Sequence, residues 1–164
     1  MEPTSDFKFL IIMKSTACAD IGNTRIKLLV NSCSDKSVAD LLYFPWRKDL
    51  HGTVNKIIAR LKKDKITELP YISVNIEAEN VLVGKLGNSE INGFPVKKFL
   101  VQPLLSDYDI GRIGMDRLAN INAARNMFRN KNIIVVDSGT ALTIEIIKGK
   151  HHKGGFILPG EKTL

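Results

Sequence analysis

The stretch "ADIGNTRIKLLV", residues 19–30, places several polar groups at the bend between two apolar segments. Asp20, Gly22, Asn23 and Thr24 stand close together, and an apolar segment follows them. A hairpin needs only Asn-Gly or Asp-Gly to reverse the chain. This bend therefore carries more polar chemistry than a turn requires.

A second stretch, "VDSGTA" at residues 136–141, repeats the Asp-x-Gly pattern with a hydroxyl close behind. For one such turn alone, a polar hairpin with a hydrogen-bonded aspartate is the simpler interpretation. The second occurrence favours a functional pair. An internal repeat on this scale also predicts two similar domains.

The composition is that of an ordinary globular protein, with 44% hydrophobic and 25% charged residues in 164. The net charge of +7 favours a polyanionic ligand or reflects a basic surface. The lysines are scattered, with short clusters such as Lys97-Lys98. The sequence therefore shows no stripe of basic residues of the kind that binds nucleic acid. The two cysteines, Cys18 and Cys33, indicate a reduced, cytoplasmic protein.

The N-terminal apolar run, residues 9–13, is too short for a secretory signal, and no stretch approaches the length of a membrane span. We predict neither secretion nor a membrane partner. Residues 1–13 are interpreted as an N-terminal extension, with Met13 as an alternative start.

Apolar periodicity predicts the order β-β-β-α-β-α-β-α in the first part of the chain, and hence a mixed sheet with flanking helices. Thr53 is the expected cap of the first helix. Leu118, Ile121, Ala124 and Phe128 form the expected apolar stripe of the last helix. The predicted strands are residues 15–19, 25–30, 38–44, 70–74 and 96–101, and the predicted helices are 53–65, 77–86 and 115–128.

The pattern then restarts with strands at 133–136, 141–147 and 151–158. We predict a first domain at residues 14–131 and the start of a second, incomplete domain at 132–164. Three strands without crossover helices leave one sheet face uncovered, which makes such a piece marginal alone. Either the chain is a fragment of a longer protein, which we favour, or another copy covers that face.

Phosphate binding explains the residue types in the two turns. Glycine lets the backbone approach an anion and present its N–H groups. Asn23 and Thr24 add neutral donors and Lys27 adds a cation, whereas Asp20 suits Mg²⁺ or its waters. Two such turns facing one another suit a nucleoside triphosphate. The sequence contains neither the P-loop pattern nor GxGxxG.

Between the turns lies "GRIGMDRLANINAARN", residues 111–126. Asp116 falls in the first turn of a predicted helix, where the helix dipole favours an acid. The alternative is that Asp116 accepts a hydroxyl proton while Arg117 binds a carboxylate. The sequence leaves these two interpretations open, and it leaves Asn120 and Asn122 as packing or surface residues.

The segment "HHKGGFILPG", residues 151–160, also has two interpretations. Gly154 and Gly155 allow a flat ligand such as adenine to lie against the backbone, or they belong to a strand bracketed by turns. His151 and His152 point to opposite faces in a strand, and a solvated turn is the expected setting. Trp46 is interpreted as anchored apolar bulk.

Two Asp-x-Gly turns that open related domains resemble the actin, hexokinase and Hsp70 superfamily. Four motifs in order resemble type III pantothenate kinase: "DIGNTRIK" (20–27), "GMDR" (114–117), "VVDSGTALTIE" (135–145) and "GGFILPG" (154–160). The resemblance implies an α/β fold with a ribonuclease H-like mixed sheet. It also implies a homodimer that phosphorylates pantothenate, the first step of coenzyme A synthesis, with ATP, Mg²⁺ and K⁺ or NH₄⁺.

The resemblance also assigns residues. Asp116 becomes the proton acceptor, and Asp137 helps to bind the monovalent cation. The pantothenate loop consists of Gly114, Met115, Asp116 and Arg117. The residues that it assigns to binding of the ATP phosphates and their metal are Asp20, Ile21, Gly22, Asn23, Thr24, Arg25, Ile26, Lys27 and Thr140.

Three departures from the family pattern accompany these matches. Tyr108 stands one residue closer to the Gly-x-Asp-Arg loop than is usual, and the usual proline is missing. Glu145 replaces an aspartate, and family members continue past the Pro-Gly pair. Two alternatives to a kinase therefore stay open: a non-catalytic relative that acts as a transcriptional accessory factor, and an inactive truncated remnant.

Overall fold

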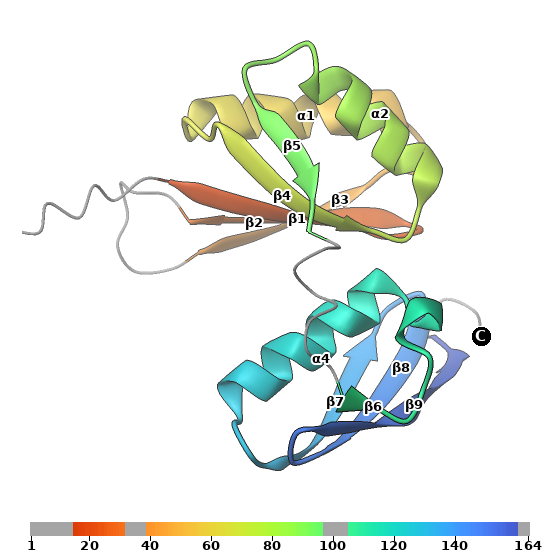
Figure 1. Cartoon of the computed structure of the whole chain (residues 1–164). Coiled ribbons are helices and arrows are strands. Elements are labelled where there is room, and N and C mark those ends of the chain that lie inside the picture. Colours follow the sequence, from red (N-terminus) through yellow and green to blue (C-terminus); the bar gives the residue numbers. More distant parts are fainter. Residues whose placement is uncertain (1–14, 32–38, 97–104, 161–164) are drawn as a thin grey trace, which may run out of the picture.

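The computed structural model describes residues 15–31, 39–96 and 105–160, which form two units, each built on a sheet (Figure 1). The described residues do not include the predicted N-terminal extension, Cys33 or Lys97-Lys98. Of the strand predicted at residues 96–101, they include only the first residue. The first unit contains β1 (Thr16–Ile21), β2 (Arg25–Asn31), β3 (Asp40–Pro45), α1 (Leu50–Lys63), β4 (Glu68–Ser73), α2 (Ile76–Leu86) and β5 (Asn92–Pro95). The second contains β6 (Leu105–Ser106), the 3-10 helix η1 (Ile110–Arg112), α4 (Met115–Met127), β7 (Asn132–Ser138), β8 (Ala141–Lys148) and β9 (His151–Pro159).

The first sheet has the strand order β3-β2-β1-β4-β5. Strands β1, β2 and β3 pair in antiparallel fashion, whereas β4 and β5 add to β1 in parallel. Helices α1 and α2 make the crossovers to β4 and β5. The predicted ribonuclease H-like mixed sheet is therefore confirmed.

Helices α1 and α2 cover one face of this sheet (Figure 1). Every second residue of the central strands is buried, and these apolar side chains form the sheet's half of the core. Helical spacing in the sequence predicts an apolar face of Val54, Ile57, Ile58 and Leu61 for the first helix. This face is confirmed, since three of these residues are buried and Ile58 is partly buried against the core. The predicted cap is wrong. Asp49 caps α1 by accepting a hydrogen bond from the Gly52 amide at 2.8 Å, while the Thr53 hydroxyl donates to the Pro45 carbonyl.

The second sheet has the order β6-β9-β8-β7, and its β7-β8-β9 meander is antiparallel like β1-β2-β3. The predicted repeat is thus present in three strands. Helix α4 lies between the two sheets (Figure 1) and buries its apolar residues mainly against the second sheet, while also contacting β4. The domain division at residue 131 stays a prediction.

The apolar stripe expected on the last helix is only partly correct. Leu118, Ile121 and Ala124 are buried, but Phe128 is 52% exposed. The helix ends at Met127, and Phe128 takes a non-helical φ of −120°, which removes its side chain from the stripe.

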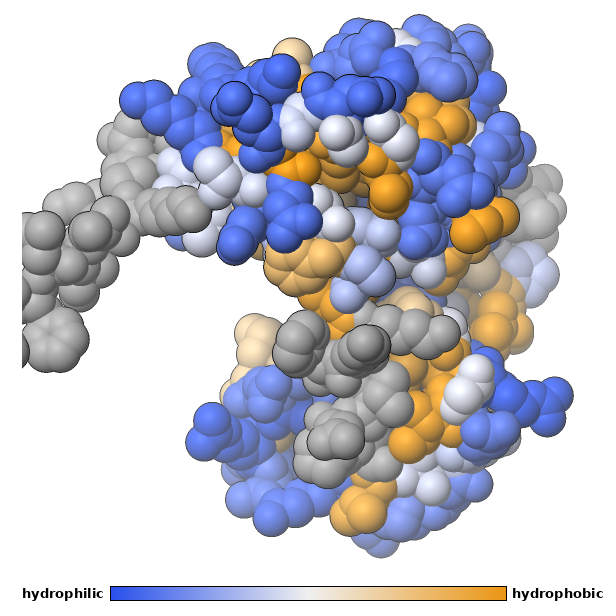
Figure 2. Space-filling view, turned by 45° about the horizontal axis from the view of Figure 1, so that its top comes forward, coloured by the Kyte–Doolittle hydropathy of each residue, from blue (hydrophilic) through white to orange (hydrophobic). Residues whose placement is uncertain are grey.

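The face of the second sheet opposite α4 is uncovered among the described residues. Ile134, Val136, Phe156 and Leu158 share that face by strand register, and Ile134 is 69% exposed. Figure 2 shows apolar side chains among hydrophilic ones on both units. None of the helices in the described part of the chain is long and apolar enough to cross a membrane.

Candidate active site

The two polar turns meet where the units approach one another. The hydroxyl oxygens of Thr24 and Thr140 lie 3.1 Å apart, although 116 residues separate them in the chain. Each turn is closed by a glycine amide: Gly22 donates to the Arg25 carbonyl, and Gly139 donates to the Ala141 carbonyl, both at 3.0 Å. The two Asp-x-Gly stretches that repeat in the sequence therefore lie at two turns that face each other.

The two aspartates lie in strands and not in the turns, which corrects the sequence interpretation. Strand β1 continues to Ile21, and β7 continues to Ser138. Asp20 is consequently paired with Lys27 across the sheet, and Asp137 with Thr143. Strand register thus fixes the direction of both carboxylates, which is a firmer support than a turn offers.

A cleft of about 150 Å³ lies between the turns and collects most of the predicted ATP-site residues. Three carboxylates reach it from three elements: Asp20 from β1, Asp116 from α4 and Asp137 from β7. The remaining lining residues are Gly22, Asn23, Thr24, Arg25, Lys27, Val74, Gly139, Thr140, Ala141 and Thr143. Ile21 and Ile26 are fully buried in the first core, so only their backbone is placed near the turn.

Lys27 supplies a cation beside these carboxylates. Its ammonium nitrogen lies 2.9 Å from Asp20 Oδ2. Partial burial opposes the charged form, but the hydrogen bond and charge of Asp20, together with the charge of Asp137, raise the pKa of Lys27. The cleft therefore presents a charged ammonium that a phosphate oxygen can approach.

Asp116 lies in the first turn of α4, two residues after the N-cap residue Gly114. Its Oδ1 accepts a hydrogen bond from the Arg117 amide at 2.8 Å. A side chain at Gly114 would place its Cβ 2.6 Å from that oxygen, so the Asp116 carboxylate would have to shift. Met115 packs against the second core. Asp116 thus makes the contact expected at a helix terminus and also lines the cleft, while its role as proton acceptor stays a prediction.

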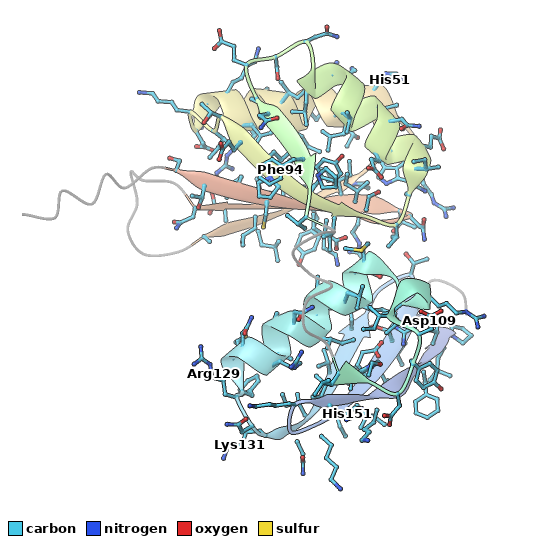
Figure 3. All side chains as sticks on the ribbon, viewed as in Figure 1. His51, Phe94, Asp109, Arg129, Lys131 and His151 are labelled. Atoms are coloured by element: carbon cyan, nitrogen blue, oxygen red, sulfur yellow. The ribbon has the colours of Figure 1, made fainter. Side chains whose placement is uncertain are left out.

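Arg117 faces a second cavity, of about 380 Å³, beside the N-terminal end of α4. Its Nε donates to Glu145 on β8. Tyr108 and Arg112 line this cavity too, so the structure brings Tyr108 close to the predicted substrate loop. Figure 3 shows Asp109, another lining residue, near this end of α4, and Arg129 beyond the other end.

The histidine pair is not in a solvated turn. His151 and His152 begin β9 and alternate between its faces, and His152 is buried. The strand interpretation of the paired glycines is confirmed. The Tyr108 ring lies against Gly154, which has a φ of +102° and no room for a Cβ, so the protein's own ring lies where a flat ligand was considered.

Four residues support the site in ways that the sequence did not indicate. Trp46 is buried as expected, but its indole N–H also donates to the Gly22 carbonyl at 3.0 Å. Asn120 donates to Asp137 Oδ2 at 3.1 Å. Glu145 and His152 form a buried pair at 2.9 Å. Only tertiary structure brings these partners together, so local patterns carried no signal for them.

Comparison with known proteins supplies the family. A family model described as type III pantothenate kinase matches residues 17–164. The chain belongs to the type III pantothenate kinase family. The type III pantothenate kinases of Teredinibacter turnerae and Helicobacter pylori are 30% identical to it over 149 residues and 32% identical over 148 residues, respectively.

These alignments cover 88% and 90% of this chain but 58% and 52% of the two relatives. The chain therefore spans about half the length of the curated relatives that it matches. Among solved structures, a Baf family protein of Campylobacter jejuni, described as a transcriptional activator, is 28% identical with a TM-score of 0.53. That match covers 90% of this chain and 56% of the other.

Proposed function

We propose that the protein transfers the γ-phosphoryl group of ATP to the hydroxyl group of pantothenate. The observation that carries this proposal is the convergence of three carboxylates and two facing turns on one cleft. Membership of the type III pantothenate kinase family supports the choice of substrates. We propose on the same ground a cytoplasmic homodimer that serves coenzyme A synthesis.

The two turns would hold the ATP phosphates. Gly22 and Gly139 let the backbone approach the phosphate oxygens, Thr24 and Thr140 add hydroxyl donors, and Lys27 adds charge. Loops of this kind bind anions through backbone N–H groups and nearby cations. Residues of both units would thus bind the phosphates.

The donor set of the cleft fits hard cations. Carboxylate oxygens are the ligands that Mg²⁺ prefers, and Mg²⁺ sites combine few protein ligands with substrate phosphates. Among the described residues, no cluster of three His, Cys, Asp or Glu side chains could hold a metal alone, which agrees with such a shared site. Asp20 would hold Mg²⁺, and Asp137, oriented by Asn120, would hold K⁺ or NH₄⁺. When bound, these ions neutralise phosphate charge.

Asp116 would accept the proton of the attacking hydroxyl. The pantothenate oxygen forms a bond to the γ-phosphorus, the bond from that phosphorus to the β,γ-bridging oxygen breaks, and ADP leaves. In-line transfer depends mainly on positioning and charge stabilisation. Arg117, the next residue, faces the second cavity and would bind the substrate carboxylate there. Consecutive residues would thereby hold the two ends of one substrate.

Phosphopantothenate formation measured by mass spectrometry tests this proposal. The chain is incubated with pantothenate, ATP, Mg²⁺ and K⁺ beside the Asp116→Asn variant. We expect product from the wild type and a loss of at least about 100-fold in the variant, a typical contribution of a general base. Turnover in Asp116→Asn near the wild-type rate would remove Asp116 from this role.

A second candidate is a transcriptional accessory factor without kinase activity. The observation in its favour is the similarity to the Campylobacter jejuni Baf family protein described as a transcriptional activator. The three cleft carboxylates favour the kinase, since a regulator has no need for a proton acceptor beside two phosphate turns. Regulatory activity that survives Asp116→Asn, with no phosphopantothenate from the wild type, would favour the accessory factor.

A further inference from the structure

The second unit buries two ionisable side chains that the proposed phosphoryl transfer does not use. Glu145 and His152 are each only 1% exposed. The only other polar residue that is buried in the described part of the chain, Thr53, is 7% exposed. Burial of a carboxylate costs free energy unless charge and hydrogen bonds compensate for it. The pair therefore needs an explanation.

Glu145 uses both carboxylate oxygens. Oε1 accepts from Arg117 Nε, and Oε2 lies 2.9 Å from His152 Nε2. On the far side of the imidazole, His152 Nδ1 lies 2.9 Å from the Ser106 hydroxyl, which accepts from the Tyr108 amide at 3.1 Å. A continuous chain of hydrogen bonds thus runs from the Tyr108 segment through β9 and β8 to α4.

One placement of the hydroxyl and imidazole protons lets each donor group make one hydrogen bond. Ser106 O–H donates to Nδ1, and the Nε2–H of a neutral His152 donates to Glu145. The cluster then contains one cation, Arg117, and one anion, Glu145, so its net charge is zero.

The space for the carboxylate comes from Gly155, the residue opposite Glu145 on β9. A Cβ at Gly155 would lie 2.6 Å from Glu145 Oε2. Glutamate is one methylene longer than the aspartate expected from the family resemblance. A long side chain and a glycine opposite it therefore act together to bring the carboxylate to Arg117.

We propose that Glu145 is a positioning residue for substrate recognition. It holds the Nε edge of the Arg117 guanidinium, so the terminal nitrogens remain for the substrate carboxylate in the cavity lined by Tyr108 and Arg112. His152 holds Glu145 in turn. This role rests on the proposed function, because it takes Arg117 as the group that binds the carboxylate. An arginine fixed in this way loses less freedom when it binds a planar carboxylate.

The main test is the affinity of Glu145→Gln for pantothenate, measured by calorimetry. We expect pantothenate binding to weaken about tenfold or more, a typical loss for a hydrogen bond to a charged group, while ATP binding stays within about twofold. The steady-state KM for pantothenate should rise more than kcat falls. A merely structural role would move ATP and pantothenate binding together.

Asp64→Asn is the matched control, since Asp64 also accepts from an arginine Nε, that of Arg60, but outside both cavities. It should leave pantothenate binding unchanged. Glu145→Asp keeps the charge and should recover part of the affinity. If Glu145→Gln does not fold, the pair His152→Gln, which keeps a donor, and His152→Leu, which removes it, replaces it. His152→Leu should then bind pantothenate more weakly than His152→Gln.

A direct readout of the contact is the Arg117 Nε–H signal in ¹⁵N NMR. We expect slow exchange with water in the wild type and fast exchange in Glu145→Gln. If Glu145→Gln binds pantothenate as tightly as the wild type does, the positioning role of Glu145 is overturned and the proposed function is not. A wild-type chain that does not bind pantothenate, yet shows the slow Nε–H signal, would instead overturn the proposed function on which this role rests.

Discussion

The two meanders of the chain have the same strand order but differ in how they are covered. In the first unit β1 pairs on both sides, with β2 and β4, and two helices cover one face. In the second unit β7 pairs only with β8 among the described residues, and α4 covers one face while the other exposes apolar side chains. The two turns also differ in length, since three residues separate β1 from β2 and two separate β7 from β8. A short polar motif thus places a polar turn in each unit, whereas the stability of that unit depends on what packs against its sheet.

The largest expected contrast is in stability. Leu28 is fully buried in the first sheet, so Leu28→Ala should lower the free energy of unfolding by ~2–5 kcal/mol. Ile134 is exposed on the uncovered face, so Ile134→Ala should change it by less than ~0.5 kcal/mol. Urea denaturation of both variants measures the difference. An equally large loss in Ile134→Ala would mean that this face is covered in solution.

Limited proteolysis should separate the two units. The first sheet packs on two helices through a larger buried core than the second sheet, which packs on α4, so the second sheet should open locally at a lower free energy. We expect the first cuts within residues 132–160, with the segment from β1 to β5 surviving as a resistant fragment. Peptide mapping by mass spectrometry locates the cuts. First cuts between β1 and β5 would reverse the stability order of the two units.

Much of this contrast could be predicted from the sequence, because it depends on local patterns. Alternating apolar residues in β1 and β2 and helical spacing in α1 defined the first core, and the repeated Asp-x-Gly pattern defined the second turn. The strand positions of Asp20 and Asp137 were missed, because a glycine two residues later does not show where strand pairing ends.

The supporting contacts of the site could not be predicted. Glu145 was noted only as a departure from aspartate, and His152 was assigned to a solvated turn. Their pairing with Arg117 requires β8, β9 and α4 to be assembled, and no spacing within one element encodes that. The same reasoning applies to the Trp46 indole, which bonds a carbonyl 24 residues away.

The contact between the turns should be worth less than core packing. Thr24→Val and Thr140→Val each remove the hydroxyl–hydroxyl hydrogen bond, at a cost of ~1 kcal/mol. We expect each variant to bind ATP several-fold more weakly in calorimetry. The double variant should lose less ATP affinity than the sum of the two single losses, since one hydroxyl–hydroxyl bond is shared. Strictly additive losses would indicate that the turns act independently.

The smallest effect concerns Lys27. Because the pKa of Lys27 is raised in the folded protein, its pairing with Asp20 stabilises fully below the ordinary lysine value of 10.5. That stabilisation should decline as the pH rises through the folded-state pKa. Thermal unfolding of the wild type and Lys27→Met should therefore differ at neutral pH and converge at strongly alkaline pH. A difference that grows with pH would contradict the sign of this shift.

The most direct test of a single nucleotide site built by two units is an NMR titration of the ¹⁵N-labelled chain with Mg-ATP. The amides of Gly22 and Gly139 report on the first and second turns separately. We predict that both signals shift along one binding curve with a common Kd. A shift of Gly22 without Gly139, or two different Kd values, would contradict the account.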